Sequence, residues 1–509
     1  MDKLYDNAIT DRWSRARLAR DARFDGMFVV AVKSTGIYCR PVCPAPLARE
    51  VNVRYFEHAA GAAAAGFRPC LRCRPERAPG LRSYGEQAFD LALKRVSEGF
   101  LAEPSVAELA ERVGVSDRHL RRQFDQRMGI GPLALHANQR LLLAKQLLAE
   151  TTLPVTEVAL AAGFASLRRF NQAFHDACGM PPTAVRKQSD ELDVVPDQIE
   201  LLLGYRPPFD YAAHLQFLAV RALPGLEWVD GERWTRQLGA DSYLQVENLP
   251  ERSALRLRLH GAQAAQIPGL LRRVRRVFDV NADPGCIAEQ LSADRVLGSL
   301  VSDRPGLRLP GMFDGFEGSV RAILGQQISV AAARTLAIRI MERCGQQFPG
   351  SEGFPQPAQL AELDFDGLGL TSQRVHSLRS LGLAVADGSL DLESPQPLAD
   401  WLEQCQRVPG IGPWTAEYMA MRVLHHPDAF PAGDLVVRKA LAAALSDGDR
   451  LPSERLVRER AEAWRPWRAY AVIQLWRAQT PAPAPPQSGP PKRRVKQTLS
   501  KQEQCNEPC

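Results

Sequence analysis

Long hydrophobic runs are missing from this 509-residue sequence. No apolar stretch approaches the roughly 20 residues that a membrane-spanning helix requires, and the N-terminal MDKLYDNAITDRWSRARLAR has no hydrophobic signal core. A marked excess of one charge is missing too, since 64 Lys and Arg face 58 Asp and Glu, for a net charge of +6. We therefore expect a cytoplasmic protein with no membrane partner, folded into several domains because the chain is too long for one core.

Cysteines are few, ten in 509 residues, and their placement is uneven. Four of the ten cysteines form two close pairs, Cys39-x3-Cys43 and Cys70-x2-Cys73, near the N-terminus. A structural disulfide is disfavoured in a reducing cytosol, whereas two close pairs separated by a longer segment are typical of a tetrahedral zinc site. The remaining six are scattered, and we expect buried small side chains or exposed tail thiols at Cys178, Cys286, Cys344, Cys405, Cys505 and Cys509.

Composition and periodicity divide the chain into five regions. The cysteine-bearing region includes the strand-like run MFVVAV, and the third region includes SALRLRLHG, which alternates as a half-buried strand does. The second and fourth regions have helical patterns, and proline and charge dominate the last, so we expect a disordered tail there. The regions are residues 1–80, 84–188, 200–283, 284–480 and 481–509.

The second region contains an internal repeat. Its copies are SVAELAERVGVSDRHLRRQFDQRMGIGP and PVTEVALAAGFASLRRFNQAFHDACGMPP. In each copy a short amphipathic helix ends at a glycine, a serine (Ser116 or Ser166) follows at a helix N-cap position, and a basic helix ends at a second glycine. One copy could be any helical hairpin, but two aligned copies favour paired helix-turn-helix units that bind DNA.

A second chemical site is indicated by VPGIGPWTAEYMAMRVL. Gly410 and Gly412 permit a tight turn whose backbone N–H groups can approach a phosphate, and Pro413 suits the first position of the next helix. A helix N-terminus that faces a phosphate anchors DNA without reading its sequence. By itself this turn could equally be an ordinary glycine turn between helices.

The residues around that turn make it more specific. Trp414 and Tyr418 are spaced i, i+4 and share a helix face, and Asp434 and Trp476 follow later in the chain. An aromatic pocket beside one carboxylate suits a flipped, electron-poor base. Core packing of the aromatic residues, and an exposed helix cap at Asp434, are the alternative interpretations.

These motifs resemble two known families that together cover over nine-tenths of the chain. Residues 1–190, with TGIYCRPVCPA, VNVRYF, AGFRPCLRCRPE and the repeat, resemble the N-terminal half of Ada-type adaptive-response regulators, whose repeat is an AraC-type pair. Residues 200–478, with RPPFDY, RPGLRLPGMFDGFEGSVRAILGQQIS, VPGIGPWTAEYMAMR, FPAGDLVVRK and WRPWRAYAVIQLW, resemble 3-methyladenine DNA glycosylase II of the helix-hairpin-helix superfamily. The resemblance implies a mainly α multidomain fold, with a small α+β zinc domain and an α+β subdomain ahead of the glycosylase helices.

The Ada resemblance implies that Cys39, Cys43, Cys70 and Cys73 bind one Zn²⁺ and that Cys39 accepts a methyl group from a methylphosphotriester in DNA. Four thiolates on Zn²⁺ leave a net charge of −2, which admits a neutral phosphotriester and repels an ordinary phosphodiester. Thr35 and Arg68 match the family's DNA contacts near the zinc. Two basic positions of the family are Pro44 and Pro46 here, so phosphate contact in this region is expected to be weaker or differently arranged.

The glycosylase resemblance implies that Asp434 is the catalytic aspartate, that Trp414, Tyr418 and Trp476 form the base pocket, and that Gln327 fills the gap left by the flipped base, where an apolar wedge is usual. It also implies a monovalent cation on the backbone carbonyls of Gln406, Val408 and Ile411. Relatives that cut the strand have lysine at the position of Trp414, so we expect a monofunctional glycosylase. The Pro-Cys-His-Arg site of an alkylguanine-transfer domain does not occur.

Three interpretations follow: a repair enzyme fused to a regulator, a transcription factor whose glycosylase part only holds DNA, or a glycosylase that uses the other regions as anchors. Intact motifs around Asp434 and Cys39 favour the first. Double-stranded DNA and RNA polymerase are the expected partners, and the protein is expected at the nucleoid. Base reading is expected from the second helix of each repeat, through Arg118, Arg121, Arg168 and Asn171.

Overall fold

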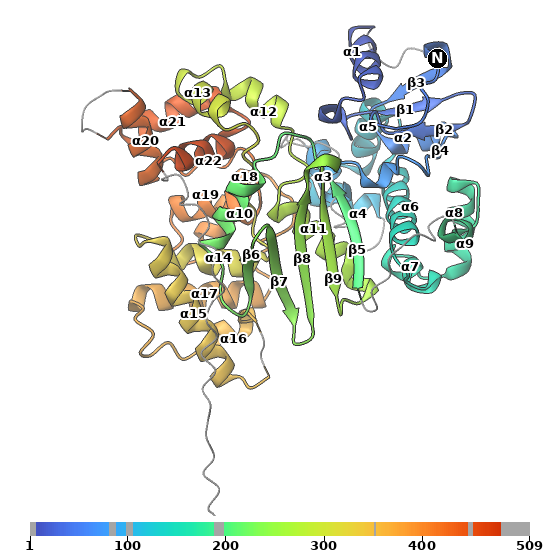
Figure 1. Cartoon of the computed structure of the whole chain (residues 1–509). Coiled ribbons are helices and arrows are strands. Elements are labelled where there is room, and N and C mark those ends of the chain that lie inside the picture. The colour runs from blue at the N-terminus through green and yellow to red at the C-terminus, as the bar shows by residue number, and fades with distance from the viewer. Residues whose placement is uncertain are drawn as a thin grey trace, which may run out of the picture.

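The computed structural model describes residues 7–80, 88–97, 105–187, 198–350, 353–445 and 451–479. The tail expected at residues 481–509 lies outside these ranges. Helices predominate, as the sequence predicts, and two antiparallel-dominated sheets mark the first and third regions (Figure 1). Within the described residues, no helix has both the length and the apolar character to cross a membrane.

The N-terminal region is a four-stranded sheet of order β3-β1-β2-β4 with helices packed around it. Strand β1 begins at Val29, two residues later than the predicted run, because Met27 still belongs to the preceding turn. The Phe28 ring stacks on Trp13 at 5.1 Å, in the same cluster as Val30. Its elements are α1 (Asn7–Leu18), β1 (Val29–Val32), β2 (Ile37–Cys39), β3 (Val53–Phe56), α2 (Ala59–Ala64) and β4 (Arg68–Pro69).

The repeat forms two helix-turn-helix units joined by one long helix, α6. The predicted caps are present: Ser116 and Ser166 each accept a hydrogen bond from the backbone N–H three residues later, and Gly129 and Gly179 end the second helices in the left-handed conformation. The elements are α3 (Ala88–Ser97), α4 (Val106–Arg112), α5 (Asp117–Met128), α6 (Pro132–Glu150), α7 (Val155–Ala161), α8 (Leu167–Cys178) and α9 (Pro182–Lys187).

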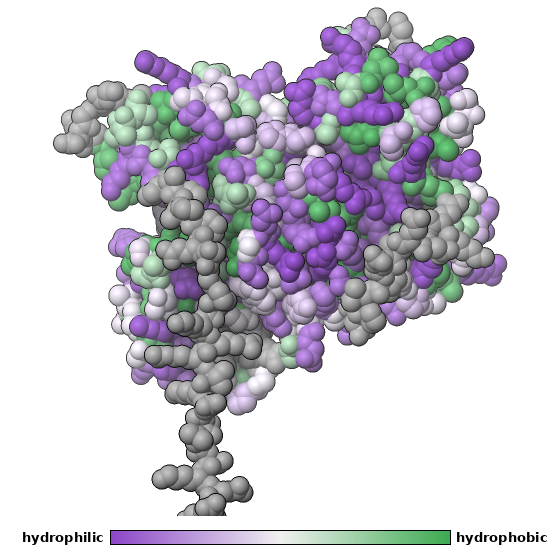
Figure 2. All heavy atoms as spheres, in the orientation of Figure 1, coloured by the Kyte–Doolittle hydropathy of each residue, from purple (hydrophilic) through white to green (hydrophobic). Residues whose placement is uncertain are grey.

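The third region is a five-stranded antiparallel sheet of order β5-β9-β8-β7-β6. One side of it is apolar and shares a hydrophobic core with α6, α7 and α8, while the side seen in Figure 2 is hydrophilic and includes ion pairs of Glu247 with Arg256 and Arg258. The elements are β5 (Gln198–Gly204), α10 (Tyr211–Ala219), β6 (Glu227–Asp230), β7 (Arg233–Gly239), β8 (Ser242–Leu249), β9 (Ala254–His260) and α11 (Ile267–Val277).

The C-terminal region is helical and has the largest core, centred on the fully buried Trp401 and Trp464. The segment FEGSVRAILGQQISVAAARTLAIRIM, which has a continuous amphipathic pattern, forms two helices, and Gln327 between them has a left-handed φ of 57°. The helices are α12 (Pro284–Leu291), α13 (Arg295–Asp303), α14 (Gly315–Leu324), α15 (Val330–Gln347), α16 (Pro357–Glu362), α17 (Ser372–Ala386), α18 (Leu398–Gln406), α19 (Pro413–Arg422), α20 (Leu435–Leu445), α21 (Glu454–Ala461) and α22 (Arg468–Ala478).

Helix α6 connects the N-terminal sheet to the third region. Lys145 and Glu76 form an ion pair at 2.7 Å, each side chain being 1% exposed, and Lys145 also donates to the carbonyl of Cys70. One turn further along, Glu150 pairs with Arg77 and accepts a hydrogen bond from the backbone N–H of Leu202 in β5 at 3.1 Å. The cysteine-bearing region and the sheet are therefore tied to the same helix.

Candidate functional sites: a cysteine cluster and an aromatic pocket

The four predicted cysteines converge. Strands β2 and β4 pair in parallel with Tyr38 opposite Pro69, which places Cys39 beside Cys70 at the strand ends. The four Sγ atoms lie within 4.8 Å of one another. Tetrahedral Zn²⁺ with bonds of about 2.3 Å needs sulfur atoms roughly 3.8 Å apart, so the cluster fits one zinc ion.

The cluster is asymmetric in its exposure. Cys39 is partly exposed, whereas Cys43, Cys70 and Cys73 are buried. The backbone N–H of Arg40 donates to Cys73 Sγ at 3.3 Å, and the Arg40 guanidinium is paired with the buried Asp25. By its exposed surface, Cys39 is the most accessible of the four to a group from outside.

The other residues predicted to contact DNA near the cysteines lie on the surface. Thr35 lies exposed in the turn between β1 and β2. Pro44 and Pro46, which follow Cys43 in the chain, are also exposed. Arg68 is also exposed, but its side chain lies against Gly179 at the end of α8. Arg68 thus faces the second helix-turn-helix unit.

The predicted base-reading residues all lie on exposed faces of the two second helices. Arg118 and Arg121 lie on α5, where Arg121 pairs with Asp117 at 2.6 Å, and Arg168 and Asn171 lie on α8. Buried phenylalanines on the opposite faces of both helices hold them against their domains. The polar faces are therefore free to meet a DNA groove.

The aromatic residues and the predicted carboxylate line one cavity of about 450 Å³. Trp414 stacks on Tyr418 with ring centroids 5.4 Å apart, and Tyr418 lies 6.1 Å from Trp476. Trp476 Nε1 donates to Asp434 Oδ1 at 3.0 Å. The sequence separates these side chains by up to 62 positions, and the fold brings them to a single wall.

Asp434 is a helix cap, as one alternative proposed, but it is not exposed. Its side chain is 8% exposed, and Oδ1 also accepts from the backbone N–H groups of Val436 and Val437 at 3.0 Å, at the start of α20. No hydrogen bond from a described residue reaches Oδ2. One oxygen therefore orients the carboxylate, and the other remains available within the cavity.

The glycine turn before α19 has the geometry that a close backbone approach requires. Gly410 has a φ of 83°, and a Cβ atom there would lie 1.9 Å from Ser377 Oγ. Gly412 is the N-cap of α19, with ordinary extended backbone. Of the three carbonyls predicted to bind a cation, those of Gln406 and Ile411 accept no backbone hydrogen bond in the described part of the chain, which suits a cation, whereas that of Val408 accepts from the N–H of Ile411 at 3.1 Å.

Gln327 lies in the exposed turn between α14 and α15, flanked by Gly325 and Ile328, which line the cavity. Its neighbour Ile328 lines the cavity and is 36% exposed, which sequence reasoning missed. Sequence reasoning also missed Phe217 and Arg221, which line the cavity from the third region. The Arg221 guanidinium lies 3.6 Å from the centroid of the Phe217 ring, and burial lowers the pKa of Arg221 to about 10. The motif RPPFDY lies just before these two residues, but the sequence does not indicate how close they come to Asp434 in the fold.

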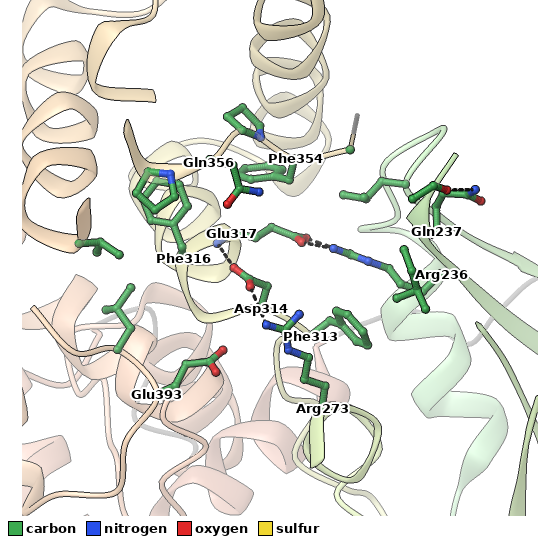
Figure 3. Close-up of a pocket in the computed structure, with 18 of the residues that line it drawn as sticks. Arg236, Gln237, Arg273, Phe313, Asp314, Phe316, Glu317, Phe354, Gln356 and Glu393 are labelled. Carbon is green, nitrogen blue, oxygen red and sulfur yellow. Dashed lines mark hydrogen bonds and ion pairs between the residues drawn. The ribbon is translucent and has the colours of Figure 1, made fainter. Parts of the chain in front are cut away.

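A larger cavity, of about 660 Å³, lies beside α14 (Figure 3). Phe313, Phe316 and Phe354 line it, and the buried ion pair of Arg236 and Glu317 crosses one wall. None of the predicted site residues lines this cavity. Size alone therefore does not locate the chemistry.

Known proteins match both halves of the chain. Family models match the metal binding domain of Ada at residues 12–76, a helix-turn-helix domain at 109–188, the AlkA N-terminal domain at 200–314, and the HhH-GPD superfamily of base excision DNA repair proteins at 320–466. A probable bifunctional transcriptional activator/DNA repair enzyme AlkA from Mycobacterium tuberculosis is 38% identical over 484 residues, which cover 92% of this chain and 96% of the relative. The chain belongs to this bifunctional AlkA family.

Two relatives from Escherichia coli correspond to the two halves of the family. DNA-3-methyladenine glycosylase 2 is 34% identical over 283 residues, covering 54% of this chain and 95% of the relative. The bifunctional transcriptional activator/DNA repair enzyme Ada is 34% identical over 183 residues, covering 36% of this chain and 50% of the relative. This member of the family thus joins a DNA glycosylase of the 3-methyladenine type to a zinc-binding, helix-turn-helix regulator that binds DNA.

Proposed function

We propose that the chain excises alkylated purines such as 3-methyladenine from DNA by hydrolysing the N-glycosidic bond, with Asp434 as the catalytic carboxylate. The observation that supports this most is the position of Asp434, oriented by Trp476 inside the aromatic cavity. Its ionised oxygen stabilises positive charge on the deoxyribose as the bond to the base breaks, and water then adds to C1′. Trp414 supplies no amine for a Schiff base, so the strand is left intact.

The base enters between aromatic side chains. N-alkylated purines are positively charged, which strengthens stacking on the faces of Trp414, Tyr418 and Trp476. The same charge makes the base a better leaving group, because it departs neutral. Selectivity for damaged bases follows from both effects.

DNA is held near the cavity by the glycine turn at Gly410 and Gly412. The N-terminus of α19 offers backbone N–H groups and a positive dipole end to one phosphate. A monovalent cation on the carbonyls of Gln406, Val408 and Ile411 would add positive charge there. Gln327, in its left-handed turn beside the cavity, occupies the space that the flipped base leaves.

The second part of the proposal is methyl transfer to Cys39, the partly exposed member of the cluster. Zinc keeps the four sulfur atoms deprotonated when bound. The Cys39 thiolate attacks the methyl carbon of a methylphosphotriester; the new S–C bond forms as the C–O bond breaks, and the electron pair remains on the phosphodiester oxygen. The thioether has no easy route back, so each chain reacts once.

Methylation then acts as a regulatory signal. It removes about one negative charge from a cluster whose cysteines are flanked in sequence by Arg68, Arg72 and Arg74. One charge at ~8 Å from a phosphate changes the energy by roughly 2 kcal/mol at an effective dielectric near 20, before screening. Promoter DNA would then be read by Arg118, Arg121, Arg168 and Asn171, and bound protein would recruit RNA polymerase. Both activities place the protein at the nucleoid in the cytoplasm.

One assay tests both parts. DNA treated with a labelled methylating agent contains N-alkylpurines and methylphosphotriesters, so free base and protein-bound methyl are scored together. Asp434→Asn should lose only base release, and Cys39→Ala should lose only protein-bound label. Label on Cys43, Cys70 or Cys73 would refute the assignment of Cys39, and a wild type that releases no base would favour a glycosylase region that only holds DNA.

A further inference from the structure

The hydroxyl group of Tyr418 is held as an acceptor, and its own proton is not used. Arg422, one helical turn further along α19, donates from Nη1 to the Tyr418 oxygen at 3.3 Å. A guanidinium has donors only, so the phenolic oxygen is the acceptor in this contact. Within the part of the chain that the structure describes, no group accepts a hydrogen bond from Tyr418.

Arg422 reaches this oxygen from behind the wall of the aromatic cavity. It is 1% exposed and does not line the cavity. Its other contacts are the carbonyl of Pro310, Met312 Sδ at 3.9 Å and the face of Phe217, whose ring centroid lies 4.6 Å away, and none of them is a carboxylate. The position of the Tyr418 oxygen is therefore fixed by a buried cation that leaves the cavity free.

A second guanidinium lies beside the same hydroxyl. Arg221 lines the cavity and donates to the carbonyl of Phe217 at 3.1 Å, and it forms no ion pair with a described residue. Burial lowers the pKa of Arg221 to about 10, and Tyr418 opposes this shift, which places the hydroxyl next to the guanidinium. Because Arg221 is also a donor only, the Tyr418 proton has to point elsewhere. The remaining side is the cavity, which Tyr418 lines and to which it is partly exposed.

A base in the cavity can accept this proton. Purines present acceptors on their edges, at N3, N7 and a carbonyl O6. Two neighbouring guanidiniums make the hydroxyl a stronger donor, because their charge stabilises the oxygen as the proton is shared. Asp434 is the one carboxylate among the described residues that line the cavity, and it accepts from Trp476 and not from Tyr418. The hydroxyl is therefore available to a ligand.

We propose that the Tyr418 hydroxyl, positioned by Arg422, donates a hydrogen bond to an acceptor on the flipped base and stabilises the charge that the base gains as the N-glycosidic bond breaks. This rests on the glycosylase activity proposed above and gives Tyr418 a role beyond stacking. The electron pair of the bond to C1′ departs with the base. A neutral base leaves as an anion and depends most on the donor, whereas a cationic N-alkylpurine leaves neutral and depends least.

The test compares two bases with the full zinc-loaded chain in single turnovers: 3-methyladenine in methylated DNA, and hypoxanthine, a neutral purine, at one position of a duplex. Tyr418→Phe keeps the ring and removes the hydroxyl. It should slow release of hypoxanthine roughly 10- to 100-fold and release of 3-methyladenine less than about fivefold. Tyr243→Phe removes a hydroxyl on β8, which does not line the cavity, and should release both bases as the wild type does.

Arg422 is tested by the same ratio of rates, which misfolding does not change because it lowers both rates together. Arg422→Met should lower the ratio of hypoxanthine to 3-methyladenine release at least threefold, and Arg422→Lys, which keeps a donor, should recover part of it. Equal slowing of both bases in Tyr418→Phe, or a wild type that releases 3-methyladenine and no hypoxanthine, would overturn the proposal. A wild type that releases neither base would instead refute the glycosylase activity on which it rests.

Discussion

Trp476 Nε1 donates a hydrogen bond to Asp434 Oδ1, and the same indole lies beside Tyr418 in the wall of the cavity. One side chain therefore orients the carboxylate and also forms the surface on which a base can stack. The two functions can be separated by substitution.

Trp476→Phe keeps an aromatic ring and removes the N–H group. We expect single-turnover release of 3-methyladenine to fall roughly ten- to a hundredfold, the value of one charge-assisted hydrogen bond, with little change in DNA affinity. The matched control is Trp228→Phe on β6, which is 41% exposed and does not line the cavity. An unchanged rate in Trp476→Phe would show that the hydrogen bond does not position Asp434 for catalysis.

The glycine turn offers a matched pair of substitutions. Gly410→Ala places a methyl group in a left-handed conformation and 1.9 Å from Ser377 Oγ, so we expect the free energy of unfolding to fall by about 1–3 kcal/mol, together with affinity for undamaged DNA. At Gly412 a Cβ meets nothing within 4 Å, and Gly412→Ala should leave the unfolding free energy nearly unchanged. Equal denaturation midpoints for the two variants would contradict the structural role of Gly410.

Glu150 should couple the two halves of the chain. Glu150→Gln weakens the ion pair with Arg77 and the hydrogen bond from Leu202, and we expect a loss of about 1–3 kcal/mol in unfolding free energy, with separate transitions for the two halves. Glu108→Gln removes an exposed pair with Arg112 and should cost under about 1 kcal/mol. Both losses of unfolding free energy are measured by chemical denaturation, monitored through zinc release and through tryptophan fluorescence. Coincident, wild-type-like transitions in Glu150→Gln would argue against the coupling.

Asp279 makes stability depend on pH. Burial raises the pKa of its carboxyl from 3.8 to about 6, so the folded chain holds a proton that the unfolded chain releases between these values. Stability from this group is therefore present below pH 3.8 and is lost as the pH rises toward 6, by up to about 3 kcal/mol. Asp279→Asn should remove this dependence. Parallel stability curves for wild type and variant between pH 4 and 6 would contradict it.

Local patterns in the sequence were sufficient for several features. The cysteine spacings predicted the cluster at Cys39 and Cys70, and the serine and glycine positions predicted the helix-turn-helix caps at Ser116 and Ser166, because caps and metal ligands depend on residues close in sequence. The break at Gln327 was not predicted, since the apolar pattern runs through it. Contacts between distant segments, such as Glu150 with Leu202, have no signature in a single sequence, because only the folded chain brings the segments together.

The most direct test of the account is release of 3-methyladenine by Asp434→Asn, measured in single turnovers beside the wild type, with borohydride added in parallel. The account predicts that the wild type releases free base and forms no borohydride-trapped adduct, and that Asp434→Asn still binds the damaged DNA but releases no base. Base release by Asp434→Asn at the wild-type rate, or a robust trapped adduct with the wild type, would contradict it.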